Sequence, residues 1–297
     1  MHDMVPTFVA AIALAVCWTL EAILPAVPAK GRVGMARLNN LLLAGLNAIP
    51  AVALAAILAV ADSITSASGF GVLRAFDLPW WAHLILAFLL LDLLQYLCHV
   101  VMHKVPAFWR LHAVHHHAEH MEATTALRFH TIEVAIHGIF TLLAVVLLGI
   151  HVTDVVIYNA VLLPAALFHH SNIRLHPSVE PILRWLVVTP RMHRVHHSRW
   201  QPETDSNYAA VLTIWDRLFG TLAPDRRPEA VNVGLDGFGP EHTRTLKGLL
   251  VTPFSDARAE LGQPADPDAA PPCTKAAKPA TDQQGTPART RARTATA

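Results

Sequence analysis

Long apolar stretches dominate the first 170 residues of the chain. Residues 5–27 are interrupted only by Glu21, residues 41–61 carry no charge, and residues 80–98 carry Asp92 as their one charge. Each stretch is close to the roughly 20 residues that a helix needs to cross a bilayer. Three such stretches are difficult to bury in a soluble protein, so the pattern predicts membrane-spanning helices rather than soluble core helices.

Two shorter apolar stretches follow, at residues 134–150 and 153–168. They predict a pair of helices joined at His151, which either dips into the membrane or just spans it. The expected fold is therefore all-α: an integral-membrane helical bundle with a helical cap on its cytoplasmic face. A signal peptide at residues 1–29 fits less well, because this segment has no Lys or Arg before a long apolar run.

Composition divides the chain into three expected parts. Residues 1–84 supply the N-terminal transmembrane helices, and residues 85–254 form a histidine-rich domain. Residues 255–297 are rich in Ala, Pro and basic residues and have few large apolar side chains, which is typical of a disordered tail. Such a tail is either simply solvated or in contact with anionic lipid headgroups.

Loop charges predict the orientation in the membrane. Lys30, Arg32 and Arg37 follow the first stretch, whereas residues 62–79 place Arg74 among acidic residues. By the positive-inside rule the first loop is cytoplasmic, and a multi-pass protein of the cell inner membrane is expected. The third stretch and the last helix of the pair then both end on the cytoplasmic side.

Histidine is the one overrepresented residue type. The chain carries 19 histidines, whereas only 15% of its residues are charged against the usual 25% or so. Its net charge of +1 gives no reason to expect nucleic acid as a partner. Three scattered cysteines provide neither a disulfide framework nor a Cys-x-x-Cys metal site.

Eight of the histidines form three boxes, at residues 99–103, 112–116 and 193–197. Helical residues at i, i+3 and i+4 share one face, so each box presents a cluster of imidazoles, which bind transition metals. Eight such ligands exceed what one tetrahedral ion can use, so two metal ions are expected. The boxes hold these histidines: His99, His103, His112, His115, His116, His193, His196 and His197.

Other histidines compete for the remaining ligand positions. His170 follows the last apolar stretch and is the best further candidate, and His130 comes next. His117 and His120 adjoin the second box and are expected at the surface. Structural or solvent roles are expected for the rest: His2, His83, His137, His151, His176 and His242.

The ligand type limits the function. Imidazole suits iron, copper, nickel or zinc and excludes magnesium and calcium. No box carries the Glu of the H-E-x-x-H pattern that many zinc hydrolases use. Three functions stay open at this point: an oxygenase acting on a lipid, a membrane metal-binding or transport protein, and a membrane zinc hydrolase. A transporter would place its ligands near the bilayer midplane, whereas these are expected at one surface.

Two polar residues precede the first box on its own helical face. Asp92 and Tyr96 stand seven and three residues before His99. A carboxylate inside a span is costly and is seldom present without a role. Asp92 either accepts a ring N–H from a ligand histidine or packs against an Arg or Tyr of another helix.

Over residues 85–225 the chain resembles the fatty acid hydroxylase/sterol desaturase superfamily of integral-membrane di-iron enzymes. The resemblance lies in an ordered set of motifs, which is far more specific than any one box. The motifs are Asp92-x-x-x-Tyr96-x-x-His99-x-x-x-His103, Trp109-x-x-His112-x-x-His115-His116, Arg128-x-His130-x-x-Glu133, His170-Ser171-Asn172, Thr189-Pro190-x-x-His193-x-x-His196-His197-Ser198, Asp205-Ser206-Asn207-Tyr208 and Trp215-Asp216-Arg217-Leu218-Phe219-Gly220-Thr221.

This resemblance implies two iron ions (Fe2+), O2 as oxidant, and hydroxylation or desaturation of a lipid such as a sterol, fatty acyl chain, ether lipid or aminolipid. His130 precedes Thr131 where the family usually has proline, so its ligand role stays open, and His169 is left out. The implied metal ligands are His99, His103, His112, His115, His116, His170, His193, His196 and His197.

The resemblance also implies supporting residues and a partner. Asp92, Tyr96, Asn207 and Asp216 are expected to hold the ligands or to tether helices. Arg217 is expected to pair with Asp216 or with a lipid headgroup. The chain has no cysteine cluster, no Gly-x-Gly-x-x-Gly and no His-Pro-Gly-Gly, so electrons are expected from a separate ferredoxin- or cytochrome-type reductase.

Overall fold

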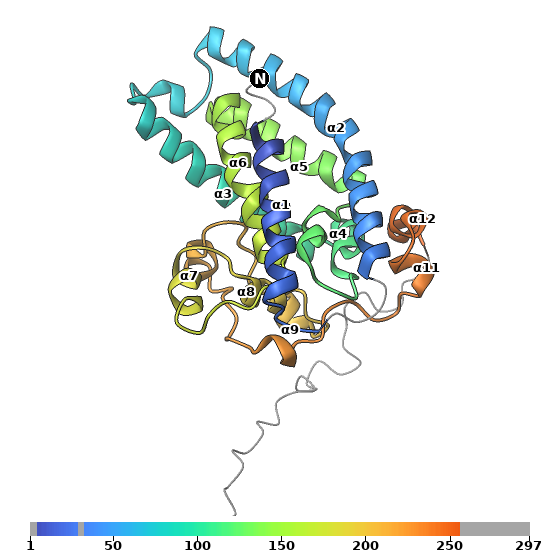
Figure 1. Ribbon diagram of the computed structural model, residues 1–297. Helices are drawn as coiled ribbons and strands as arrows, with labels where there is room; N and C mark the ends of the chain where they lie inside the picture. Colours follow the sequence, from blue (N-terminus) through green and yellow to red (C-terminus); the bar gives the residue numbers. More distant parts are fainter. Residues whose placement is uncertain (1–4, 29–32, 256–297) are drawn as a thin grey trace, which may run out of the picture.

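Five long helices form the body of the protein in a computed structural model that describes residues 5–28 and 33–255 (Figure 1). All five are long and apolar enough to cross a membrane. The described residues form no β-strand, so the expected helical membrane bundle is confirmed. The helices are α1 (Val5–Ile23), α2 (Val33–Ser68), α3 (Trp80–Lys104), α5 (Thr131–Leu143), which continues into a π-helical turn (Ala144–Leu148), and α6 (Val152–His170).

The helices differ from the expected apolar stretches mainly in α2. It extends well beyond residues 41–61 at both ends, because polar residues such as Asn39 and Asn40 are buried against the cap and so prolong the packed helix. The helical pair joined at His151 is confirmed. His2, the basic loop residues Lys30 and Arg32, and the expected tail beyond Ser255 lie outside the described residues.

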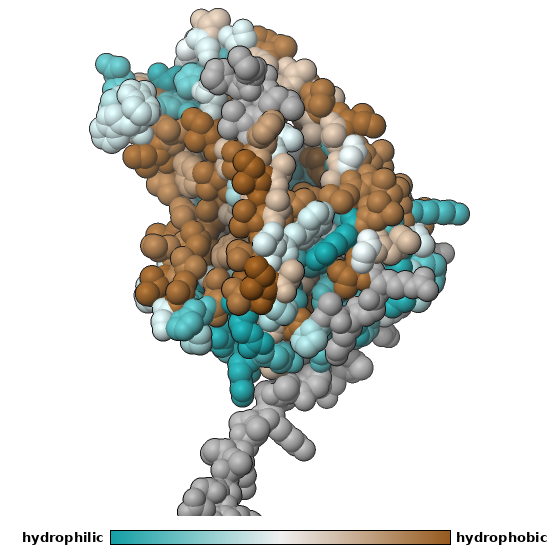
Figure 2. Space-filling view, viewed as in Figure 1, coloured by the Kyte–Doolittle hydropathy of each residue, from teal (hydrophilic) through white to brown (hydrophobic). Residues whose placement is uncertain are grey.

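Seven short helices gather at one end of the bundle, where α3 and α6 end (Figure 1). We call residues 105–130 and 171–255 the cap. Hydrophilic surface gathers at this end in Figure 2, whereas apolar surface covers the bundle. The cap helices are α4 (Pro106–His116), α7 (Glu180–Leu186), α8 (Pro190–His196), α9 (Gln201–Thr204), α10 (Ile214–Leu218), α11 (Pro240–Thr243) and α12 (Leu246–Val251).

Local sequence fixes where the two box-bearing cap helices begin. Pro106 and Pro190 occupy the first turns of α4 and α8, where a missing N–H is harmless and the fixed φ favours a helix. Thr189 accepts a hydrogen bond from the backbone N–H of Met192 and so caps α8. The residue at which each helix begins determines the direction around the helix axis in which its histidines point.

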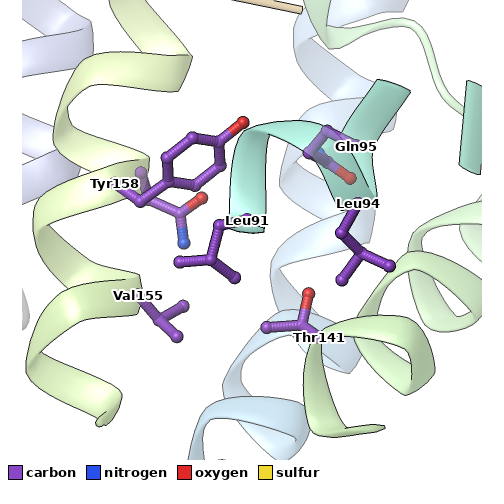
Figure 3. A pocket seen from close by; sticks show the side chains of 7 residues that line it. Leu91, Leu94, Gln95, Thr141, Val155 and Tyr158 are labelled. Carbon is purple, nitrogen blue, oxygen red and sulfur yellow. The ribbon is translucent and has the colours of Figure 1, made fainter. Parts of the chain in front are cut away.

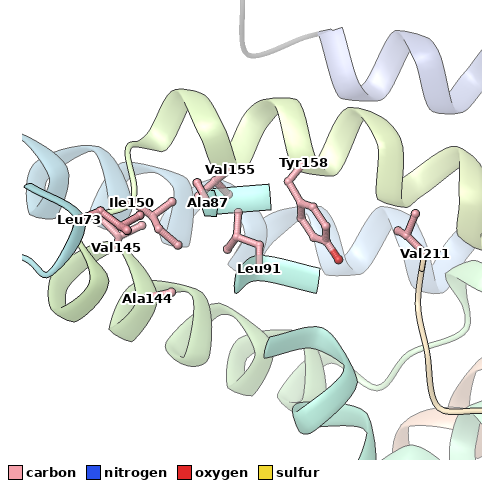
Figure 4. Close-up of a cluster of buried hydrophobic side chains, with 9 residues drawn as sticks. All are labelled: Leu73, Ala87, Leu91, Ala144, Val145, Ile150, Val155, Tyr158 and Val211. Atoms are coloured by element: carbon pink, nitrogen blue, oxygen red, sulfur yellow. The ribbon is translucent and has the colours of Figure 1, made fainter. Parts of the chain in front are cut away.

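The largest apolar core lies in the half of the bundle away from the cap (Figure 4). Leu91 of α3 meets Val155 and Tyr158 of α6, and Val145 of the π-helical turn closes the cluster. Fully buried Ala87 lets the neighbouring helices approach closely, as small residues do between membrane helices. Burial of such side chains stabilises each by about 1.5–3 kcal/mol relative to exposure to water.

A small cavity of about 30 Å³ lies nearer to the cap, between α3, α5 and α6 (Figure 3). Leu91 and Val155 line it together with polar Gln95, Thr141 and Asn159. Its volume suits one or two water molecules rather than a lipid chain.

Buried Glu21 fastens α1 to the cap. One of its carboxylate oxygens accepts hydrogen bonds from the backbone N–H groups of Ala123 (2.8 Å) and Asn172 (2.7 Å). Its other oxygen pairs with Arg37 of α2 at 3.1 Å, and Arg37 also reaches Glu122 at 3.1 Å. This network fixes the segment directly after His170, the last residue of α6.

The end of the bundle away from the cap depends on a close approach of two glycines. Gly71 has φ +126°, and a Cβ there would lie 2.4 Å from the Cα of Gly149. We therefore expect Gly71→Ala to destabilise the protein by about 2–3 kcal/mol. Gly69→Ala is the matched control, because Gly69 also has positive φ (+65°) but faces open space, so only about 1 kcal/mol of backbone strain is added.

Thermal unfolding of both variants in detergent measures this difference. The midpoint should fall several degrees further for Gly71→Ala than for Gly69→Ala. Equal midpoints would contradict the close approach.

Candidate metal centre

Nine buried or nearly buried histidines converge where α3, α4, α6 and α8 meet. They form two adjacent groups, and within each group one ring nitrogen per residue lies within 4.8 Å of all the others. These nine are the complete set of ligands expected from the sequence. The first group is His99, His103, His112, His116 and His196; the second is His115, His170, His193 and His197.

Both H-x-x-H-H boxes contribute to both groups. On α4, His112 and His116 belong to the first group and His115 to the second. The box on α8 is divided the other way: His196 belongs to the first group, whereas His193 and His197 belong to the second. Adjacent helical residues diverge by about 100°, so a single helix can supply both groups only if it packs between them.

Backbone carbonyls orient three of the rings. The Nδ1 atoms of His99 and His196 each lie 2.7 Å from a carbonyl oxygen, of Tyr208 and Ser206 respectively. The Nδ1 of His170 lies 2.8 Å from the carbonyl of Ala166. A carbonyl can only accept, so the proton of each neutral ring sits on Nδ1 and Nε2 presents a lone pair to the group.

A buried carboxylate orients a fourth ring. Glu133, at the start of α5, lies 2.6 Å from the Nδ1 of His112, and its side chain is fully buried. This contact fixes the tautomer of His112 and raises its basicity as a ligand. The role of Glu133 was not expected from the sequence; the available signal was its place three residues after His130, as the acidic residue of an apolar stretch.

The spacing between ring nitrogens matches that of ligands around one ion. The Nε2–Nε2 distances are 3.2 Å for His112–His116, 3.0 Å for His115–His170, 2.9 Å for His170–His193 and 3.2 Å for His193–His197. With metal–nitrogen bonds of about 2.1 Å, ligands at right angles lie about 3.0 Å apart and tetrahedral ones about 3.4 Å. The observed distances are close to those expected for ligands that would share one ion.

Burial keeps the cap ligands uncharged. It lowers the pKa of His196 to about 3 and overcomes a hydrogen bond that favours the charged form. Metal binding requires neutral imidazole, so these rings are ready to bind a cation at neutral pH. Burial, assisted by neighbouring imidazoles, also lowers the pKa values of four others well below the usual value: His115, His116, His193 and His197.

Several inward-facing nitrogens find no hydrogen-bond partner among the described residues. They include the Nε2 atoms of His99, His103 and His196, all of which belong to the first group. A buried polar atom left without a partner costs about 1–3 kcal/mol. A cation at the centre of each group would satisfy these lone pairs, so the residues present fit two first-row transition-metal ions.

Two polar side chains hold the loop that orients the rings. Asp216 accepts hydrogen bonds from the backbone N–H groups of Tyr208 (2.8 Å) and Ala209 (3.1 Å). Asn207 has φ +51° and donates to the carbonyl of Met192 in α8 at 3.0 Å. Both residues lie where the motifs placed them, and both support the histidines through the backbone.

Two roles were open for Asp92, and contact with a ligand histidine is not the one observed. Its carboxylate accepts hydrogen bonds from Tyr158 (3.0 Å), the indole N–H of Trp215 (2.8 Å) and the backbone of Leu212 (3.1 Å). Its alternative role, packing against a Tyr of another helix, is the one observed. Tyr96 likewise bonds Thr221 at 2.9 Å rather than a ligand.

Three expected positions need comment. His117 is buried, not at the surface, because its ring bonds Arg128 at 2.9 Å. His130 lies outside both groups, since it caps α5 and its other nitrogen lies 3.2 Å from the carbonyl of Leu250. The guanidinium of Arg217 lies 4.0 Å from the ring centroid of Trp185 and donates to the carbonyl of Arg184, rather than to Asp216.

The remaining described histidines belong to neither metal group. His169 is buried with its ring centroid 4.2 Å from that of His193, yet it belongs to neither group. The others with assigned structural or solvent roles also lie outside: His83, His137, His151, His176 and His242.

Comparison with known proteins agrees with this geometry. Residues 84–221 match the family description "Fatty acid hydroxylase". Over this segment, slightly under half of its length, the chain is similar to the fatty acid hydroxylase family. The matched segment contains all nine histidines of the two groups, and no solved structure matches the chain.

Three relatives illustrate the family. An ornithine lipid hydroxylase of Rhizobium tropici is 28% identical over 63% of this chain and 51% of its own length. The human alkylglycerol monooxygenase is 36% identical over 54% of this chain and 35% of its own. The human cholesterol 25-hydroxylase is 28% identical over 47% and 51%. The match thus spans between a third and a half of each relative.

The contact between Glu133 and His112 predicts a selective loss of metal affinity. Glu133→Gln keeps the shape but removes the charge that supports His112, and we expect metal affinity of the first group to fall about 10–100-fold. Competition with a chelator, read out as metal per chain, measures it. Glu119→Gln is the matched control, because Glu119 pairs with Arg244 away from both groups. Equal affinities in both variants would show that Glu133 does not support the metal.

Proposed function

We propose that this protein is a membrane-bound di-iron oxygenase that uses O2 and external electrons to hydroxylate or desaturate a C–H bond of a lipid. The observation that carries the proposal is the pair of adjacent all-histidine groups at the cap end of α3 and α6. Similarity to the fatty acid hydroxylase family model and to relatives named as a lipid hydroxylase and a monooxygenase supports the same proposal.

The ligand set favours redox chemistry over the two other functions. Neither group contains a carboxylate that could act as the general base of a zinc hydrolase. Two adjacent groups suit a reaction that needs two electrons from the metals. A transporter would need a path past its ligands, whereas the described cap helices close around these histidines and leave them almost entirely buried.

The residues of the chain have separate tasks in this mechanism. Nine neutral imidazoles would hold the irons, which supply the activation of O2 and the removal of a hydrogen atom from an unactivated carbon. Glu133 and the carbonyls of Ser206 and Tyr208 keep the rings in their binding tautomers. The apolar helices exclude water, which would otherwise quench the oxidant, and admit a substrate that is itself apolar.

The relatives suggest which lipids to test. By name they act on an aminolipid, an ether lipid and a sterol. Alkyl or sterol carbon in a bilayer is common to all three. We infer that the substrate of this protein is such a lipid, approached from the membrane, and that fatty acyl lipids complete the set of classes to be tested.

Partners and orientation complete the proposal. A separate ferredoxin- or cytochrome-type reductase supplies electrons, since the sequence carries no redox motif of its own.

The histidine groups face the cytoplasm of a cell inner membrane, as the basic residues before α2 favour. A variant that combines Cys273→Ser with Asp236→Cys keeps only the buried Cys17 and Cys98 besides the new thiol, and it should react with a membrane-impermeant maleimide only after cells are opened. Reaction in intact cells would reverse the orientation.

Activity tests the proposal directly. The purified iron-loaded protein, with a reductase and a lipid panel, should consume O2 only when a substrate lipid is present. The product should be one oxygen heavier or two hydrogens lighter by mass spectrometry. His197→Ala should abolish turnover because it removes a ligand, whereas His176→Ala is the control, since His176 is exposed and outside both groups. Near-normal turnover of His197→Ala, or lipid-independent O2 uptake, would refute the proposal.

A further inference from the structure

An exposed apolar surface lies on the cap, outside the five candidate spans. It consists of side chains from α7 and from α10 with the residue that follows it, and each residue is between 51% and 67% exposed. A contiguous surface of this kind usually marks contact with a protein or a membrane. We call it the α7–α10 surface: Ile182, Trp185, Leu186, Ile214, Leu218 and Phe219.

The backbone beneath this surface needs no water. The carbonyls at the end of α7 would normally be hydrated. Here the hydroxyl of Thr213 donates to the carbonyls of Arg184 (3.1 Å) and Trp185 (3.0 Å). The backbone N–H of Thr213 donates to the carbonyl of Leu186. Arg217 donates to the carbonyl of Arg184 at 2.9 Å. Internal satisfaction of this kind is what a backbone in contact with lipid requires.

The surface is fastened to the side of a membrane span. Leu212 and Trp215, at the base of α10, both donate to Asp92 of α3. Asp92 lies twelve residues before Lys104, the end of α3, which places this contact about 18 Å up the helix from its cap end. The cap segment therefore rises alongside α3 to a level that lies within the candidate span.

Apolar surface is continuous from the span to the cap at this place. Phe219 stacks on Tyr96 of α3 with ring centroids 5.2 Å apart, and Leu97 of α3 is exposed nearby in sequence. In Figure 2 the apolar surface of the bundle runs down the left side to the level at which α7 lies in Figure 1. Trp185 under the guanidinium of Arg217 is a pair typical of the membrane interface.

We infer that the α7–α10 surface is inserted in the lipid bilayer, in the leaflet on the histidine side, and that lipid acyl chains cover it. The inserted surface adjoins the first histidine group through Phe219, Tyr96 and Tyr208, whose ring lies 5.5 Å from that of His99. One consequence rests on the proposed function: a lipid substrate contacts the cap while it is still inside the bilayer.

Depth-dependent quenching of a fluorescent label tests this inference without any catalytic turnover. Full-length protein with Cys273→Ser keeps only the buried Cys17 and Cys98, so a thiol-reactive NBD dye would label a new cysteine alone. The new cysteines are Ile182→Cys and Leu218→Cys. Asp236→Cys is the matched control, an exposed cap position beside Arg199. Each protein is reconstituted in phosphatidylcholine vesicles with and without 5-doxyl phosphatidylcholine.

The labels at positions 182 and 218 should lose several-fold more fluorescence to the doxyl lipid than the label at 236, and iodide in the water should show the reverse order. Strong iodide quenching at 182 and 218 would mean that water covers the surface and would overturn the inference. Protection from both quenchers would mean that protein covers it, either a second copy or another segment of this chain, and would equally overturn it. Neither result would bear on O2 uptake, so the proposed function fails or stands separately.

Discussion

Nine imidazole rings packed against one another are the constraint on which the rest of this structure depends. Four of these rings direct their Nδ1–H to a carbonyl or a carboxylate, so each of them presents an Nε2 lone pair to the other rings. His170, for example, offers one Nε2 lone pair to both His115 and His193. One lone pair cannot accept two good hydrogen bonds at once, and the Nε2 atoms of His99, His103 and His196 have no hydrogen-bond partner among the described residues. A cation at the centre of each group would use these lone pairs.

The fold around the groups follows from that requirement. Because α4 and α8 each supply both groups, they must pack face to face between α3 and α6. Short helices that begin at proline fix the phase of the rings, and the loop around Asn207 places two carbonyls behind them. The long helices then have two tasks: they carry three of the nine ligands, and they present an apolar surface to lipid.

Much of this could be predicted from the sequence, because hydropathy and helical spacing are local properties. The five long helices and the eight histidines of the boxes follow from them, whereas His170 was only a candidate until the resemblance to a known family completed the set of nine. The hydrogen-bond partner of a buried side chain is not a local property. The sequence allowed Asp92 to bond either a histidine or a tyrosine, and only the packing of α6 and α10 against α3 brings Tyr158 and Trp215 to its carboxylate. For the same reason the role of Glu133, the burial of His117 and the division of each box between two groups could not be read from spacing alone.

The most direct test of the central claim is anomalous X-ray diffraction at the iron absorption edge from crystals of the iron-loaded protein. Two anomalous peaks are expected, one enclosed by His99, His103, His112, His116 and His196, the other by His115, His170, His193 and His197. A single peak, peaks outside these groups, or rings that turn away from the ions would contradict the account.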